Sequence, residues 1–139
     1  MKTVTIILTK KDARKSLRFY QFWTLLFVLL FVIGIYYNFS YTIAFSIVGF
    51  IISVIFSYFN HRYLKTKGKT VSKSIIDINS VRNSLLYYKI FIAFWFITMI
   101  LLFFTGFDGI LASTLFIFAI IVFYRRLKFT SSFLKKKKK

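Results

Sequence analysis

A run of residues without any charged side chain, from Phe19 to His61, constrains this chain more than any other feature. It is bordered by Arg18 and Arg62, and no Lys, Arg, Asp or Glu lies between them. As a helix rising ~1.5 Å per residue, the run would be about 65 Å long, roughly twice the ~30 Å hydrocarbon thickness of a bilayer. The run therefore predicts two membrane crossings.

Two short polar turns divide the apolar sequence into four helices. Asn38-Phe39-Ser40 breaks the first block, and Thr105-Gly106-Phe107-Asp108-Gly109 breaks a second one. Turns this short make the flanking helices antiparallel neighbours. The predicted fold is all-α, a polytopic membrane protein forming one membrane domain (residues 1–139), with four transmembrane helices arranged as two hairpins, at residues 19–37, 41–59, 85–104 and 110–127.

The remaining segments, residues 1–18, 60–84 and 128–139, are polar and basic. The first opens on a β-like run, Thr3 to Leu8, and Thr9 with Asp12 three residues later is typical of a helix N-cap, so a helix should begin near Lys10. In the connector, Val71, Ile75, Ile78, Val81 and Leu85 recur at helical spacing. They predict an amphipathic helix over residues 70–85, lying on the membrane surface or packed on the end of the bundle.

The basic residues predict the orientation. All 21 Lys and Arg lie in or next to the three polar segments, against three acidic residues and a net charge of +18. By the positive-inside rule, both termini and the connector are cytoplasmic, in the bacterial inner membrane or, in a eukaryote, the ER membrane. Because the charges lie outside the apolar blocks, we expect anionic lipid headgroups as partners and no nucleic acid.

The residues expected to contact anionic lipid or a partner are Lys65, Lys67, Lys69, Lys73, Arg125, Arg126, Lys135, Lys136, Lys137, Lys138 and Lys139. The five terminal lysines are open to three interpretations: anchoring to headgroups, an ER-retrieval-like signal, or a solvated tail that only helps to set the topology.

The two halves resemble each other at their borders. Ser16-Leu17-Arg18-Phe19-Tyr20 is similar to Ser84-Leu85-Leu86-Tyr87-Tyr88, and His61-Arg62-Tyr63-Leu64-Lys65 to Tyr124-Arg125-Arg126-Leu127-Lys128. The pattern fits a tandem repeat of one hairpin, and it equally fits two unrelated hairpins with basic flanks.

One face of the predicted second helix carries small residues at spacings of three and four: Thr42, Ser46, Gly49, Ser53 and Ser57. Small side chains let helices approach closely, and their hydroxyls can bond across the contact. We expect tight helix packing here, either within the chain or against a second copy or another membrane protein.

Reactive groups are few. The acids are Asp12, Asp77 and Asp108, the one histidine is His61, and the chain has no cysteine. Catalysis or metal binding needs several such groups to converge. We therefore expect no enzyme activity, no cofactor and no metal site.

The chain resembles the GtrA-like small membrane proteins in its four spans and its basic cytoplasmic ends. It also resembles them in two helix-exit segments, Asn60-His61-Arg62-Tyr63 and Arg125-Arg126-Leu127-Lys128-Phe129. That resemblance implies translocation of a lipid-linked sugar or phospholipid. The lack of reactive groups and the small-residue face favour a different function, an accessory subunit or protective, immunity-type protein acting through helix-helix contacts. A holin-like pore former is the third hypothesis.

Overall fold

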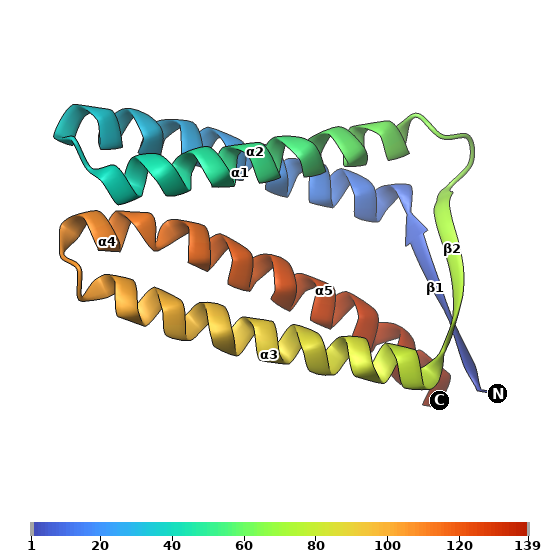
Figure 1. Ribbon diagram of the computed structural model, residues 1–139. Helices are drawn as coiled ribbons and strands as arrows, with labels where there is room; N and C mark the ends of the chain where they lie inside the picture. Colours follow the sequence, from blue (N-terminus) through green and yellow to red (C-terminus); the bar gives the residue numbers. More distant parts are fainter. Residues whose placement is uncertain (1, 139) are drawn as a thin grey trace.

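The computed structural model describes residues 2–138, with Lys137 and Lys138 described by their backbone only. Two long helical hairpins lie side by side and are joined at one end by a short β-ribbon (Figure 1). The elements in chain order are β1 (Thr3–Thr9), α1 (Lys10–Tyr37), α2 (Ser40–Leu64), β2 (Thr70–Asp77), α3 (Ile78–Phe103), α4 (Phe107–Ala112) and α5 (Thr114–Lys138).

Local signals define the first hairpin. Thr9 and Asp12 form the capping box expected at the start of α1: the Asp12 amide donates to Thr9 Oγ1 at 3.3 Å, and the Thr9 amide donates to Asp12 Oδ2 at 3.2 Å. Asn38 ends α1 in a left-handed conformation (φ 58°), which asparagine tolerates better than most residues. Since α2 starts at Ser40, the two helices are antiparallel neighbours.

The second hairpin repeats this order of elements. β2 leads into α3 through Asp77, whose side chain accepts a hydrogen bond from the Asn79 amide at 3.2 Å. Gly106, at φ 95°, turns the chain into α4, which is followed almost directly by α5. Each half of the chain is thus a strand, a capped long helix, a tight turn and a returning helical segment.

The connector differs from its prediction. Residues 70–77 form strand β2, antiparallel to β1 with Thr3 opposite Asp77 and Ile6 opposite Ser74, and α3 begins only at Ile78. The predicted amphipathic helix over residues 70–85 is therefore wrong over residues 70–77, while residues 78–85 are helical as the start of α3. Thr70, Val71, Ile75 and Ile76 are β-branched residues that favour strands, and pairing with β1 satisfies their backbone groups.

The core lies between the hairpins. Tyr20, Trp23, Phe27 and Leu30 of α1 are buried with Phe118 of α5. The ring centroids of Trp23 and Phe118 are 5.0 Å apart, and those of Phe27 and Phe118 are 5.3 Å apart. Helix α3 packs mainly on α5, and Val81 is its only buried residue among those described. The core is thus made by α1, α2 and α5, with α3 at its edge.

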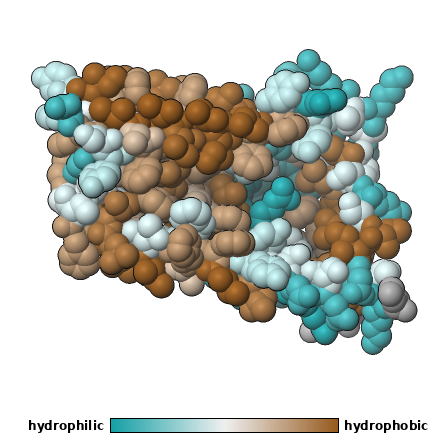
Figure 2. All heavy atoms as spheres, in the orientation of Figure 1, coloured by the Kyte–Doolittle hydropathy of each residue, from teal (hydrophilic) through white to brown (hydrophobic). Residues whose placement is uncertain are grey.

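Four helical segments are long and apolar enough to cross a membrane, which confirms the predicted set of four apolar helices in a mainly helical fold. Apolar surface covers most of the bundle, whereas hydrophilic residues gather where the ribbon lies (Figure 2). We call this the ribbon end, and the opposite end, with residues 38–39 and 104–106, the turn end. The chain has the architecture of a multi-pass membrane protein.

Candidate functional site

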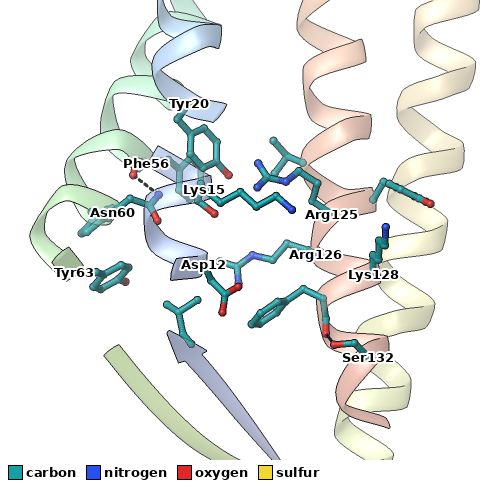
Figure 3. A pocket seen from close by; sticks show the side chains of 16 residues that line it. Asp12, Lys15, Tyr20, Phe56, Asn60, Tyr63, Arg125, Arg126, Lys128 and Ser132 are labelled. Atoms are coloured by element: carbon teal, nitrogen blue, oxygen red, sulfur yellow. Dashed lines mark hydrogen bonds between the residues drawn. The ribbon is translucent and has the colours of Figure 1, made fainter. Parts of the chain in front are cut away.

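A cavity of about 680 Å³ lies between the two hairpins near the ribbon end. We call it the inter-hairpin cavity. It is lined by α1, α2 and α5, with one residue from β1 (Figure 3). The lining residues are Leu8, Asp12, Lys15, Ser16, Tyr20, Phe56, Phe59, Asn60, Tyr63, Val122, Tyr124, Arg125, Arg126, Lys128, Phe129 and Ser132.

The lining is strongly cationic. The lining contains Lys15 of α1 and Arg125, Arg126 and Lys128 of α5, and Asp12 is its one carboxylate. Lys15 and Arg125 extend toward one another, Arg126 reaches toward Asp12, and Lys128 lies on the side of α5 away from α1 (Figure 3). Asp12 already accepts hydrogen bonds from the amide and hydroxyl of Thr9, the latter at 2.8 Å. Like charges brought together at the edge of an apolar bundle repel one another. The cavity is therefore suited to a ligand that carries negative charge.

Arg125 is held in place by aromatic packing. Its guanidinium carbon lies 4.0 Å from the centroid of the Phe19 ring, a cation-π contact, and Phe19 stacks on Phe118 at 6.3 Å. Arg125 is half-buried, whereas Arg126, Lys128 and Lys15 are exposed. At ~1.5 Å per residue, Arg125 lies about 27 Å along the helix from the start of α4, a distance close to the ~30 Å hydrocarbon thickness of a bilayer.

Aromatic side chains close the cavity toward the turn end. Tyr20 both lines the cavity and belongs to the buried core, and it stacks on Phe56 of α2 at 5.0 Å. On the α2 wall, the side-chain amide of Asn60 donates to the Phe56 carbonyl at 2.8 Å. The cavity thus has a cationic wall on α5, a mixed polar and aromatic wall on α2, and an apolar floor.

The small residues of α2 face the protein interior. Thr42, Ser46, Gly49 and Ser53 are buried, and Ser57 is partly buried. A Cβ atom added to Gly49 would lie 2.4 Å from the Phe27 ring, so glycine is what allows α1 to approach. The Ser46 and Ser53 hydroxyls donate to carbonyls of α2 itself, at Ile43 and Gly49, and do not reach α1.

Asp108 connects the two hairpins at the turn end. Its carboxylate accepts hydrogen bonds from the Tyr41 amide (3.2 Å), the Thr42 amide (2.9 Å) and the Thr42 hydroxyl (2.7 Å). The α2 N-cap, Phe39, has no side chain able to do this. Asp108 therefore caps α2 from the other hairpin, where negative charge also complements the helix dipole.

Sequence reasoning missed Asp108, although two signals were present. A helix that begins after Phe39 leaves its first amides without a side-chain acceptor, and Asp108 is the one acidic residue in the two turns. Buried or membrane-facing amides need partners, so pairing these two features predicts the contact.

The structure separates the residues proposed to contact anionic lipid. Arg125 and Arg126 line the inter-hairpin cavity, together with Lys15 and Lys128, which the sequence did not single out. Lys65, Lys67 and Lys69 lie exposed between α2 and β2, Lys73 is exposed on β2, and Lys135 and Lys136 are exposed near the end of α5. The side chains of Lys137 and Lys138, and all of Lys139, lie outside the described residues.

Among residues 2–138, no group of three His, Cys, Asp or Glu side chains is placed to hold a metal ion. The chain matches no protein-family model, no curated protein and no solved structure in the comparisons made with it. The case for a function therefore depends on the geometry of the chain itself.

Proposed function

We propose that this protein binds the phosphate-bearing headgroup of an anionic lipid in the inter-hairpin cavity and moves it between leaflets, with the ribbon end in the cytoplasm. The observation that carries the proposal is the excess of cations in the cavity lining, where Lys15, Arg125, Arg126 and Lys128 stand against one carboxylate. Arginine and lysine are the main phosphate-binding side chains, and arginine adds bidentate hydrogen bonding.

The depth of the cavity favours a lipid. At about 27 Å along the helix from the start of α4, Arg125 would reach the level of the headgroups in a bilayer spanned by these helices. The cavity wall also includes exposed aromatic residues of α2 and α5, Phe59 at 42% and Tyr124 at 55% exposed. A headgroup can thus occupy the cavity while its acyl chains remain in the bilayer. At the turn end, the aromatic floor and the Asp108 contact hold the two hairpins together, whereas at the ribbon end the cavity separates them. A transporter that works by alternating access is expected to differ in this way between its two ends in any one state.

Lipid movement can be measured in liposomes that contain the purified protein and headgroup-labelled phosphatidylglycerol, as loss of label on adding a membrane-impermeant quencher. We expect the wild type to accelerate the inner-leaflet signal loss. Replacing both Arg125 and Arg126 with Gln should slow this about 30-fold, since each cation near the headgroups contributes about 1 kcal/mol.

The matched control is the pair Lys135→Gln and Lys136→Gln, which removes the same charge from exposed positions of the same helix outside the cavity. It should retain nearly the wild-type rate. If protein-containing and empty liposomes lose signal at the same rate, translocation is excluded. Equal loss of activity in both variants would assign the effect to general surface charge.

Removing the carboxylate of the cavity should strengthen the binding of an anionic lipid, whereas removing the arginines should weaken it. Asp12→Asn deletes the negative charge among four cations but keeps an oxygen that can accept from Thr9. We expect about fivefold tighter binding of phosphatidylglycerol in nanodiscs, measured by native mass spectrometry. Asp77→Asn makes the same substitution at the N-cap of α3, away from the cavity, and should leave binding unchanged. Equal affinities for the two variants would contradict this electrostatic account.

An accessory or protective protein acting through helix-helix contacts is a second candidate, favoured by the exposed apolar surface of α3. Leu86, Ile90, Phe94, Ile97 and Leu101 are all more than half exposed. The small-residue face of α2 gives it less support, because α1 already occupies that face. Crosslinking in intact membranes tests this candidate, and recovery of the protein with no other membrane protein would count against it.

A holin-like pore is supported least, since aromatic rings fill the space beyond the cavity.

A further inference from the structure

The cations of the inter-hairpin cavity belong to two different walls. Lys15 extends from α1 toward α5, where Arg125 extends toward it and Arg126 reaches toward Asp12 (Figure 3). An anion that neutralises both walls must accept hydrogen bonds from opposite directions at once. The number of its free oxygens therefore decides how well it fits.

The two common kinds of lipid phosphate differ in this respect. A phosphodiester headgroup has two free oxygens and one negative charge. A phosphate monoester has three free oxygens and a charge of about −1.5 to −2 at neutral pH. Three oxygens allow one to face Lys15 while two accept the fork of an arginine. The monoester also offsets more of the repulsion among the four cations.

Arg125 is the residue best placed to discriminate. The Phe19 ring, 4.0 Å from the guanidinium, restricts its position, so it loses less freedom on binding than an unrestrained side chain. It is also the least exposed of the four cations, and charge interactions strengthen as water is excluded. An additional negative charge on the ligand should therefore strengthen its interaction with Arg125 more than its interaction with the other three cations.

We propose that the inter-hairpin cavity selects a lipid that ends in a phosphate monoester over lipids whose phosphate is a diester. The proposal rests on the function proposed above and specifies its substrate class. Phosphatidic acid and polyprenyl phosphate are lipids of this chemistry. Free inorganic phosphate shares the three-oxygen group but lacks the chains that would leave the cavity beside Phe59 and Tyr124.

The test uses the full chain in phosphatidylcholine nanodiscs doped with phosphatidic acid or with phosphatidylglycerol of identical acyl chains, and counts bound lipid by native mass spectrometry. We expect phosphatidic acid to bind at least about fivefold more tightly than phosphatidylglycerol. Arg125→Gln should remove most of that preference, and Lys15→Gln, on the opposite wall, should reduce it independently. Arg14→Gln, an exposed neighbour on α1 outside the cavity, should preserve it.

The outcomes separate this proposal from the one on which it rests. Equal binding of both lipids above phosphatidylcholine, weakened by Arg125→Gln, would overturn monoester selectivity and leave anionic-lipid binding standing. Absence of binding to either lipid by the folded wild type would overturn both. Inorganic phosphate that displaces phosphatidic acid at equal concentration would identify the free ion as the ligand and overturn a lipid substrate. Circular dichroism of each variant checks that it remains helical.

Discussion

Gly49→Leu should unfold at a markedly lower denaturant concentration than the wild type. Even a Cβ atom at this position would lie 2.4 Å from the Phe27 ring, and Phe27 is 1% exposed in the core. Overpacking of this kind typically costs about 1 to 3 kcal/mol, and leucine places three more carbons in the same space. Unfolding by SDS in mixed micelles, followed by circular dichroism, measures the loss.

Two variants identify the cause. Ala44→Leu adds bulk to the same helix on an exposed face and should change the midpoint little. Combining Gly49→Leu with Phe27→Ala removes the ring that obstructs the new side chain and should recover part of the lost stability. A Gly49→Leu protein as stable as Ala44→Leu would show that α1 and α2 do not meet through this contact.

Asp108→Ala should separate the hairpins at the turn end. It leaves the amides of Tyr41 and Thr42 without their acceptor and removes a favourable charge from the start of α2. We expect a loss of about 2 to 4 kcal/mol, above the usual value for one helix cap because two amides and a hydroxyl are affected. Asp108→Asn keeps one acceptor oxygen and should lose about half as much.

The separation can be followed directly because the chain has no cysteine. Phe39 and Phe107 lie across the same contact, with ring centroids 5.8 Å apart. Cysteines introduced at these two positions should be joined efficiently by a short bifunctional thiol reagent when Asp108 is present, and poorly in Asp108→Ala. Unchanged crosslinking in both backgrounds would mean that the carboxylate does not hold the hairpins together.

Local patterns predict much of the fold. Hydropathy locates the four apolar helices, Thr9 with Asp12 predicts the start of α1, and the short turns predict antiparallel hairpins. These features depend on neighbouring residues and on the solvent each segment prefers. The strand at Thr3–Thr9 was recognisable as a β-like run for the same reason.

The partner of that strand was not predictable by the same means. Val71, Ile75 and Ile78 match a helical period, and only the arrival of β1 makes the strand the better solution for residues 70–77. The cavity was likewise not predictable from local sequence. Its cations come from α1 and α5, two helices far apart in the sequence that pack together through Trp23 and Phe118. Arg125 and Arg126 stood out as basic residues at a helix exit, while nothing local marks Lys15 as their counterpart.

The ribbon also places a condition on how the chain is assembled. β1 is made first, yet Thr3 must wait for Asp77, and at about 5 to 20 residues per second that interval lasts roughly 4 to 15 s. During this time the first hairpin can insert alone. In a membrane the strands can meet only when that hairpin has crossed twice and returned to its starting side. Pairing of β1 with β2 would therefore require that the first hairpin has both of its ends on the same side of the membrane.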